Sequence, residues 1–305
     1  MRLMSKSKLW LSIAGLVTLA GIIIFAVFGL KPGIDFTGGS LMEITYAPGE
    51  RPSVPEIKQA VEAAKIVGTV NVQLVDERGA QLRFKEVTEE GHQTILQVLS
   101  QGGTATTSAA LKQVEELHFE TIGPSIGKEL KRRATYAIVI AIIVIIAYIA
   151  WSFRRVSKPV ASWKYGVAAI VALFHDVILV VGVFALLGRY AGIEIDTAFI
   201  AALLTVLGYS VNDTIVVLDR VRENLPRSNE DFLGTVNTSI NQTLARSVNT
   251  TLTTVLALLA LLFFGGETIH YFILALTIGI ASGAYSSIFI AAPILVLWEK
   301  WQRKI

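Results

Sequence analysis

The chain of 305 residues is 53% hydrophobic and 17% charged, whereas about a quarter of a soluble chain would be charged. This deficit, together with several apolar runs of about 18 residues or more, excludes a soluble globular protein and indicates an integral membrane protein. The absence of cysteine excludes disulfides and thiolate metal sites. Most of the basic residues behind the net charge of +3 lie beside apolar runs, so no nucleic-acid partner is expected.

The first apolar run, Leu9–Leu30, follows three basic residues and so resembles a secretory signal. Its length of about 22 residues exceeds the roughly 7–15 of a signal's apolar region. No small-residue cleavage site follows it. We therefore predict a retained transmembrane helix at 9–30. It belongs to a first segment, 1–30, whose N-terminal end carries the three basic residues.

Five further spans are predicted within a membrane domain that covers residues 134–298. Their ranges are 134–153, 165–187, 197–218, 247–264 and 270–298. Lysine and arginine number three in the N-terminus, four in each loop after spans two and four, and three in the tail, 299–305. The short opposite loops contain Arg189 alone, so the positive-inside rule predicts that both termini are cytoplasmic. The basic cluster 131–133 disagrees, but it ends a long segment, and long segments translocate largely regardless of charge.

The long segment 31–133 is predicted to be a soluble domain on the outer face. Residues 40–47 alternate like a strand, and 55–65 have the apolar spacing of an amphipathic helix. Two strand-like stretches then flank "DERGA" as in a hairpin, and a helix within 91–117 and a strand at 117–123 follow. The order β-α-β-β-α-β predicts an α+β ferredoxin-like domain. The Gly/Thr/Ser-rich stretch 100–108 is predicted to be a loop.

The glycine-rich stretch "GIDFTGGS" follows the first span, and its candidate residues are Gly33, Asp35, Gly38 and Gly39. It lacks the Lys-Ser/Thr ending of a phosphate loop, so a tight exit from the membrane is favoured over ligand binding. Paired glycines in such a turn permit positive φ or a close backbone approach. Elsewhere in the domain, His92 and His118 lie far apart without other plausible ligands, so no metal site is predicted.

Span three places His175 and Asp176 near the bilayer midplane. At about 100° apart on a helix, both side chains could face the interior of a bundle. One interpretation is a mutually satisfied pair that links helices. The other is a secondary proton relay, because ionisable residues inside a membrane are costly and usually functional.

Span four ends with "YSVNDTIVVLDR", in which Tyr209, Asn212 and Asp213 share a helix face at spacings i, i+3 and i+4. Asp213 lies roughly 24 Å along the helix from Thr197, in the inner third of the membrane. An interfacial carboxylate satisfied by water is the alternative. The apolar turn 215–218 between Asp213 and the next charge argues against that alternative.

Span five begins with an unusually polar half that follows Arg246 and includes Thr250 and Thr254. Arg246 is either a positive-inside residue or the partner of Asp213 at a similar depth. In span six, Gly279 and Gly283 form a GxxxG element that is followed by Ser286 and Ser287. This pattern indicates a helix-packing face first and a hydrated path second.

Four ordered motifs resemble those of the SecD/SecF family of Sec translocase accessory subunits, which have membrane cores of the resistance-nodulation-division type. They are "GIDFTGGS", "YSVNDTIVVLDRVREN", "SINQTLARSVNTTLTT" and "ALTIGIASGAYSSIFIAAP". The resemblance covers nearly the whole chain, and the small outer domain is similar to that of SecF rather than SecD. Many relatives have "SRT" where this chain has Ala245, Arg246 and Ser247, a departure that keeps the arginine.

The resemblance implies a bacterial inner-membrane protein that pairs with the six-span SecD beside the SecYEG channel, with YajC and YidC as further partners. The family uses the proton gradient to assist late translocation and release of exported unfolded polypeptide. The proton is then the coupling ion, no cofactor and no enzyme activity are expected, and membrane lipid surrounds the spans. Asp213 and Arg246 match the family's membrane acid and arginine, whereas a second essential carboxylate belongs to SecD.

Two other functions remain as alternatives. A proton-coupled secondary transporter of a small substrate would share the intramembrane charges, as efflux relatives do. A passive scaffold of the translocon would use its polar residues only for helix packing. An enzyme is not predicted, because the sequence contains no recognisable nucleophile-base or metal constellation.

Overall fold

The computed structural model describes residues 3–75, 77–100, 114–154 and 160–302. The chain divides into two compact units. The bundle unit comprises 1–31 and 136–305, and the sheet unit comprises 32–135. Asp76, the first residue of the predicted hairpin turn "DERGA", lies outside the described residues, and so do residues 101–108 of the predicted loop 100–108.

In the described part of the chain, six long apolar helices confirm the predicted membrane-spanning architecture, and each is long and apolar enough to cross a bilayer. They are α1 (Ser7–Phe28), α5 (Pro124–Ser152), α6 (Ser162–Tyr190), α7 (Thr197–Asn224), α8 (Phe232–Phe264) and α9 (Glu267–Ser286). A short 3₁₀ helix, η1 (Leu3–Lys6), precedes α1. The last span continues from α9 through a π-helix, η2 (Ser287–Ala291), into α10 (Ala292–Gln302).

Two helices begin well before the spans that hydropathy predicts. α5 starts at Pro124 rather than near 134, and α8 starts at Phe232 rather than near 247. Both added segments are polar, so they form helix without contributing to an apolar run. The start of α8 is fixed by Asp231, whose side chain accepts a hydrogen bond from Gly234 N at 2.8 Å.

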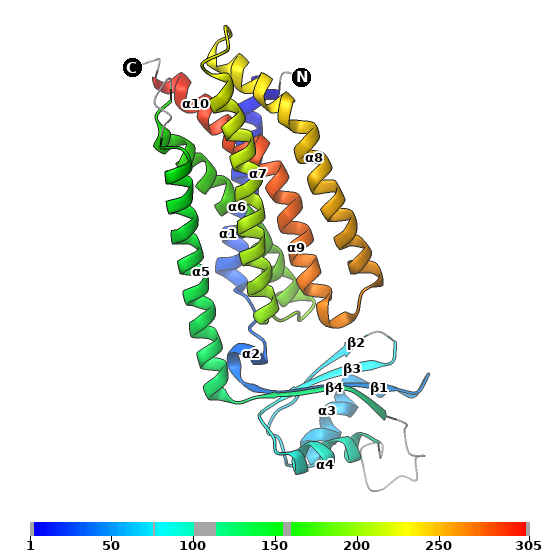
Figure 1. The fold of residues 1–305 in the computed structure, drawn as a ribbon. Helices are drawn as coiled ribbons and strands as arrows, with labels where there is room; N and C mark the ends of the chain where they lie inside the picture. The colour runs from blue at the N-terminus through cyan, green and yellow to red at the C-terminus, as the bar shows by residue number, and fades with distance from the viewer. Residues whose placement is uncertain (1–2, 76, 101–113, 155–159, 303–305) are drawn as a thin grey trace. The chain divides into compact units, whose positions relative to one another are not determined.

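The centre of the bundle unit is built from α6, α7 and α9, with α1 packed along α6 (Figure 1). The helices α1 and α6 approach each other closely at Gly21 and Gly182, where a Cβ on Gly182 would lie 2.9 Å from Gly21 Cα. The start of α1 and the end of α10 lie at the same end of the bundle (Figure 1). α5 stands along one side and is largely exposed, apart from its C-terminal end at Ile149.

The sheet unit contains one antiparallel sheet of four strands in the order β2-β3-β1-β4. The strands are β1 (Gly39–Tyr46), β2 (Asn71–Val75), β3 (Gly79–Phe84) and β4 (Val114–Ile122). The helices are α2 (Ile34–Thr37), α3 (Val54–Ala63) and α4 (Glu89–Ser100). Along the chain, omitting the short α2, the elements follow the order β-α-β-β-α-β.

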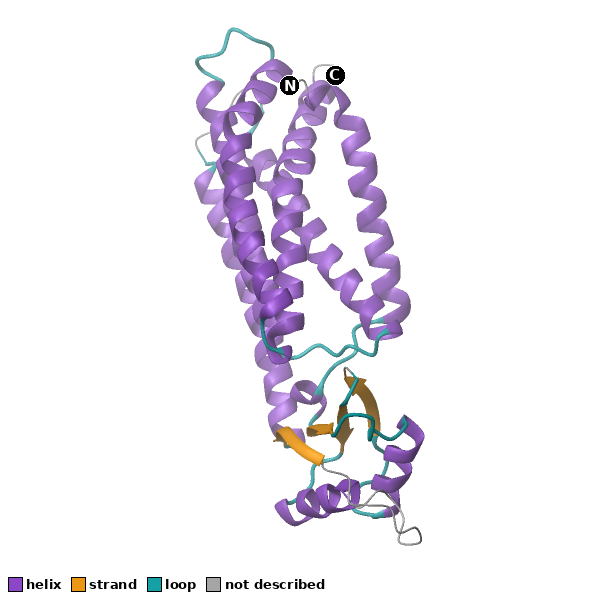
Figure 2. Ribbon diagram, turned by 90° about the vertical axis from the view of Figure 1, so that its right-hand side faces the viewer, coloured by secondary structure: helices purple, strands orange, loops and turns teal. Residues whose placement is uncertain are grey.

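One face of this sheet is covered by α3 and α4 (Figure 2). The alternation in β1 points Met42, Ile44 and Tyr46 into the core, as expected for a strand with one buried face. α3 begins with a capping box, in which Ser53 N donates to the Glu56 carboxylate at 2.7 Å. The core therefore forms between the sheet and its two longer helices.

Candidate functional site

Asp176 lies at the centre of the bundle unit and is fully buried. Ser210 on α7 donates to Asp176 Oδ2 at 2.6 Å, and Ser286 on α9 donates to the same oxygen at 2.6 Å. Ser282, one turn earlier on α9, donates to Asp176 Oδ1 at 2.5 Å. We call these four residues the Asp176 seam, because they tie α6 to α7 and α9.

The seam exists because α7 and α9 approach each other closely at glycines. A Cβ on Gly279 would lie 2.3 Å from Val206 Cγ2, and one on Gly283 would lie 3.1 Å from Ser210 Cβ. Small residues at such positions let two helix backbones approach closely. Side chains then have a shorter distance to span between the helices. The short serine side chains thereby reach the carboxylate on the third helix.

Asp213 lies one turn beyond Ser210 on α7 and is half-buried. Ser247 on α8 donates to Asp213 Oδ1 at 2.7 Å, and Ser287 at the start of η2 donates to Oδ2 at 2.6 Å. The consecutive residues Ser286 and Ser287 therefore serve different carboxylates. Successive side chains on a helix point about 100° apart, so one turn of α9 and η2 contacts both α6 and α7.

The predicted partner of Asp213, Arg246, immediately precedes Ser247 but is exposed. No ion pair joins Arg246 to Asp213 in the described part of the chain, where serine hydroxyls hold the carboxylate instead. Arg246 lies about 27 Å along α8 from Phe264, a depth similar to that of Asp213 in α7.

An exposed stripe on each of two neighbouring helices forms what we call the open face. The stripe on α7 consists of Ala201, Thr205, Gly208 and Asn212. The stripe on α8 consists of Arg246, Asn249, Thr250 and Thr253. The spacings i, i+4, i+7 and i+11 in α7, and i, i+3, i+4 and i+7 in α8, put each set on one side of its helix. The open face is thus unusually polar for helices of this hydropathy.

The other polar residues predicted near Asp213 make separate contacts. The Tyr209 hydroxyl lies 3.5 Å from Thr254 Oγ1, which links α7 to α8 one turn from Asp213. The Thr250 hydroxyl donates to the carbonyl of Arg246 at 2.8 Å, within its own helix. Tyr209 and Thr254 therefore meet at the α7–α8 junction, and neither of these hydrogen bonds involves the Asp213 carboxylate.

His175 and Asp176 are adjacent in sequence but contact different helices. The His175 Nδ1 atom lies 2.7 Å from Thr18 Oγ1 on α1, and its ring lies 6.1 Å from that of Tyr285. Asp176 contacts α7 and α9 instead. His175 thus links α6 to α1, whereas Asp176 links α6 to α7 and α9. The two side chains therefore do not form the mutually satisfied pair that was one of the predictions.

The glycine-rich exit lies in the sheet unit, where the start of α5 meets β1. Gly38 and Gly39 both have positive φ, at +73° and +127°. A Cβ on Gly38 would lie 2.8 Å from Pro124 Cα, and one on Gly39 would lie 2.7 Å from Phe84 O. Gly33 and Asp35 belong to α2 and its N-cap, a short helix that the sequence did not predict. The turn therefore requires glycine for backbone conformation and for space.

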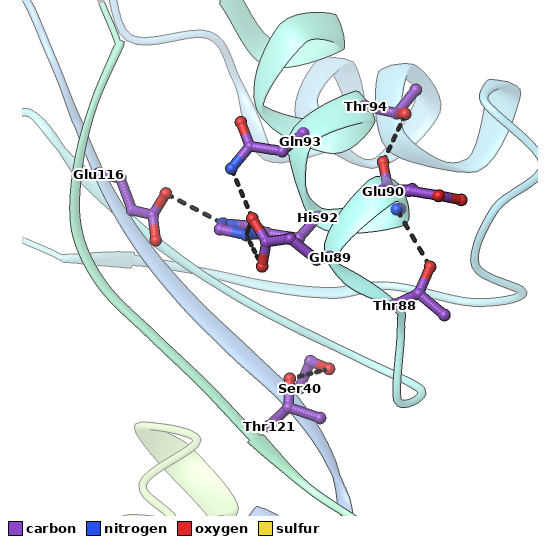
Figure 3. Close-up of polar contacts among 10 residues, drawn as sticks. Ser40, Thr88, Glu89, Glu90, His92, Gln93, Thr94, Glu116 and Thr121 are labelled. Atoms are coloured by element: carbon purple, nitrogen blue, oxygen red, sulfur yellow. Dashed lines mark hydrogen bonds and ion pairs between the residues drawn. The ribbon is translucent and has the colours of Figure 1, made fainter.

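The histidines of the sheet unit pair with glutamates. The His92 Nε2 atom lies 3.0 Å from Glu116 Oε2, and Nδ1 lies 3.3 Å from Glu89 Oε1 (Figure 3). The His92 ring also stacks on Phe119 with centroids 3.7 Å apart. Hydrogen bonds from Gln93 and His92 lower the pKa of Glu89. His118 lies 3.6 Å from Glu120, and the described residues contain no metal-type cluster of three or more ligands.

Sequence reasoning did not single out the serines Ser210, Ser247 and Ser282 as site residues. Serine is common in membrane helices as a small packing residue, so its presence alone predicts no site. One signal was available: Ser282 lies four residues before Ser286, which places both on one face of a helix. That face is the one directed at Asp176.

Comparisons with known proteins match both ends of the chain to one family. The family described as "Protein export membrane protein SecD/SecF, C-terminal" matches residues 103–301, and the SecD/SecF GG motif matches residues 23–50. The second match contains the paired glycines of the exit from α1. The first contains every residue of the Asp176 seam and the open face.

Individual relatives agree. The protein translocase subunit SecF of Thermobaculum terrenum is 43% identical over 302 residues, which cover 93% of this chain and 89% of that protein. The SecDF of Bacillus subtilis is 36% identical, and the match covers 97% of this chain but 38% of the longer protein.

A solved structure supports the same assignment. The crystal structure of SecDF from Thermus thermophilus, described as a translocon-associated membrane protein, superposes with a TM-score of 0.80 at 33% identity. The superposition covers 97% of this chain and 38% of that one. The chain therefore belongs to the SecD/SecF family of protein-export membrane proteins.

Proposed function

We propose that this chain is an accessory subunit of the Sec protein-export machinery that uses the proton gradient to assist late translocation and release of exported polypeptides. The observation that carries the proposal is Asp213, a half-buried carboxylate within an apolar helix that two hydroxyls hold. A carboxylate at such a depth costs several kcal/mol unless it has partners, so it is rare without a function. The family assignment supplies the task of protein export.

In the proposed cycle, Asp213 binds and releases a proton while its partners change. The serine hydroxyls of Ser247 and Ser287 donate to the charged form and can accept from the neutral acid, because a hydroxyl does both. Arg246, at a similar depth and next to Ser247, is the alternating partner of the charged form. Each charge that crosses gains about 2.3 kcal/mol per 100 mV, which suffices to bias a helix movement of a few kcal/mol.

The proposal includes a SecD partner that covers the open face. A guanidinium and two amides, those of Arg246, Asn212 and Asn249, are exposed there on helices of high hydropathy. In lipid such groups lack hydrogen-bond partners, whereas a second helical subunit with matching polar groups would satisfy them. SecDF chains that carry a SecF-like portion within a longer chain support this pairing. The SecYEG channel would be the neighbour of the assembled pair.

Location and fold class complete the proposal. We place the six spans in a bacterial inner membrane with both termini in the cytoplasm, because lysine and arginine concentrate in the loops on that side. The sheet unit would lie on the outer face and adopt the ferredoxin-like fold. Its β-α-β-β-α-β order and the strand order β2-β3-β1-β4 support that class.

The test compares Asp213→Asn with a matched control on the same helix. Asp219 makes a surface ion pair with Arg222 at 2.7 Å, and both side chains are 38% exposed. Asp219→Asn therefore makes the same chemical change outside the proposed site. Both variants are assayed for gradient-stimulated export into membrane vesicles that contain the assembled translocon.

We expect Asp213→Asn to abolish the stimulation by an imposed proton gradient and Asp219→Asn to retain it. Asn has nearly the same volume as Asp and still accepts a hydroxyl hydrogen bond, so assembly should be intact. An Asp213→Asn complex that still responds fully to the gradient would contradict the proton mechanism. A changed tolerance of drugs or lipids in Asp213→Asn, with no export defect, would favour the small-substrate transporter.

A further inference from the structure

The bundle unit contains a second intramembrane carboxylate that the proposed cycle does not use. Asp176 is fully buried, and its two oxygens accept three hydrogen bonds from serine hydroxyls on two other helices. No arginine, lysine or histidine forms an ion pair with it among the described residues. Its three hydrogen-bond donors are neutral hydroxyls, so the carboxylate lies in a pocket of neutral donors.

The pocket accommodates both protonation states of Asp176. Three donated hydrogen bonds stabilise the carboxylate, because bonds to a charged group are stronger than neutral ones. Burial without a cation stabilises the neutral acid, because an unpaired buried charge is poorly solvated. Such opposed influences are typical of groups that exchange protons rather than of groups fixed in one state.

Ser286 on α9 can change from hydrogen-bond donor to hydrogen-bond acceptor when Asp176 is protonated. The Ser286 hydroxyl lies 2.6 Å from Asp176 Oδ2 and 3.2 Å from the carbonyl of Gly283. A hydroxyl has one proton, so it donates either to the carboxylate or to that carbonyl. When it donates to Gly283, its oxygen is free to accept the proton of a neutral Asp176.

Ser287 has the same two choices at Asp213. Its hydroxyl lies 2.6 Å from Asp213 Oδ2 and 3.0 Å from the carbonyl of Ala284. The two adjacent serines thus form matched hydroxyl switches, one for each carboxylate. They meet where α9 changes to the π-helix η2, and π-bulges inside α-helices are frequent at functional sites.

Asp213 is an acidic neighbour of the Asp176 pocket. Asp213 lies one turn beyond Ser210 on α7, and the consecutive residues Ser286 and Ser287 donate to Asp176 and to Asp213 respectively. Among the described residues, His175 on α6 and Tyr285 on α9 are further titratable groups of this region, with rings 6.1 Å apart, and the His175 ring is directed to α1. Two carboxylates in a medium of low dielectric repel each other when both are charged, so their proton occupancies are linked.

We propose that Asp176 is a second proton-binding carboxylate of the bundle, and that the Ser286–Ser287 pair couples its protonation to that of Asp213. This inference rests on the proposed proton-driven function and adds a second group to it. The coupling is mechanical as well as electrostatic, because a movement of this α9 turn changes the hydroxyl donors of both carboxylates together. A proton bound at one carboxylate therefore alters the other.

The experiment uses the complex with its partner, reconstituted in lipid vesicles, and the variants Asp176→Asn, Asp213→Asn and Ser286→Ala. Two measurements are made on each complex. The first is export stimulated by a proton gradient, as a function of pH. The second is the pH-induced infrared difference spectrum in the region of protonated carboxyl groups, which detects proton binding independently of export.

We expect Asp176→Asn to lose gradient-stimulated export and one carboxyl band, while Asp213→Asn loses the stimulation and a different band. Ser286→Ala keeps both carboxylates, so it should shift the pH profile of export and the frequency of the Asp176 band. A purely structural hydroxyl would change protein yield without shifting either. If Asp176→Asn does not assemble, the infrared shift in Ser286→Ala decides alone.

The inference is overturned if Asp176→Asn stimulates export normally and its spectrum loses no carboxyl band. It is also overturned if the spectrum of Ser286→Ala matches that of the unaltered complex. These results are distinct from failure of the proposed function, in which Asp213→Asn would itself keep gradient-stimulated export. Loss of function in Asp213→Asn with an unaffected Asp176→Asn would leave Asp213 as a proton group of this chain and would assign Asp176 to structure.

Discussion

The Asp176 seam and the open face are both polar regions of the same bundle, yet their polar groups are satisfied in opposite ways. In the seam, each carboxylate oxygen accepts a hydrogen bond from a serine hydroxyl on another helix. The helices there are in close contact, with no space for added side-chain atoms. On the open face, threonine hydroxyls bond back to their own helix, and Arg246 and Asn212 extend outward. The seam is therefore a finished core, and the open face is a surface suited to a second subunit. Asp213 lies one turn beyond Ser210 of the seam and next to Asn212 of the open face, and its own hydrogen bonds come from Ser247 and Ser287.

The largest expected difference between the two regions is in the stability change that a Gly→Ala substitution causes through packing. Gly279→Ala places a methyl group 2.3 Å from Val206, at the α7–α9 contact that holds the seam together, whereas a Cβ on Gly208 of the open face meets nothing within 4 Å. Overpacking typically costs about 1–3 kcal/mol. Gly208→Ala should instead stabilise α7 by about 0.5–1 kcal/mol, because alanine favours helix over glycine.

Thermal unfolding of the purified chain in detergent checks this difference in sign. The double variant Gly279→Ala with Val206→Ala is the control, because it removes the methyl groups that the new Cβ would meet. It should recover much of the lost stability. Equal melting of the two alanine variants would mean that the seam is no more tightly packed than the open face.

The hydroxyls of the seam should produce a smaller difference between the two regions, because the control change on the open face is nearly neutral rather than stabilising. Ser282→Ala removes one donor from a fully buried carboxylate, and hydrogen bonds to charged groups contribute about 1.5–3 kcal/mol. Thr253→Val is the matched change on the open face, where the hydroxyl bonds only within its own helix. That change should shift stability by less than about 0.5 kcal/mol, as for most surface substitutions. A comparable loss in both variants would show that burial does not distinguish the two hydroxyls.

These regions also differ in how far the sequence predicted them. The six spans and the shared depth of Asp213 and Arg246 follow from hydropathy and helical spacing, which are local properties of the chain. The beginning of α8 at Phe232 could not be predicted in this way, because its first half is polar. That segment becomes helix through its N-cap and its packing.

The partners of the carboxylates were beyond the reach of the sequence for a different reason. Ser210 and Ser286 lie 34 and 110 residues from Asp176, so only the packing of three helices brings them together. The pairing of Asp213 with Arg246 remains a prediction, since the structure gives this carboxylate two serines. Depth along a helix is readable from spacing, but rotation about its axis relative to a neighbour is not. That rotation decides whether Ser247 or Arg246 faces α7.

The next prediction sharpens the comparison from the side of the open face. Asn212→Leu should leave the melting of the isolated chain nearly unchanged, because Asn212 is exposed in it. It should weaken copurification of the SecD partner, and each 1.4 kcal/mol lost lowers affinity about tenfold. Val144→Leu, an exposed apolar position on α5, is the control and should retain the partner. Normal copurification with Asn212→Leu would mean that the partner binds elsewhere.

The smallest effect provides a reference carboxylate outside the bundle. Gln93 and His92 hydrogen bonds lower the pKa of Glu89 in the folded sheet unit, so its contribution to stability is present above the ordinary glutamate pKa of about 4.3. It is lost as the pH falls through the lower, folded value. Hydrogen exchange in α4 of the intact chain, corrected for intrinsic rates, should therefore rise slightly in acid. Glu89→Gln should remove this rise and Glu90→Gln should keep it. If Glu89→Gln leaves the acid response unchanged, the neighbouring imidazole and amide do not stabilise this carboxylate, and the contrast with the hydroxyl-bound carboxylates of the bundle loses its reference.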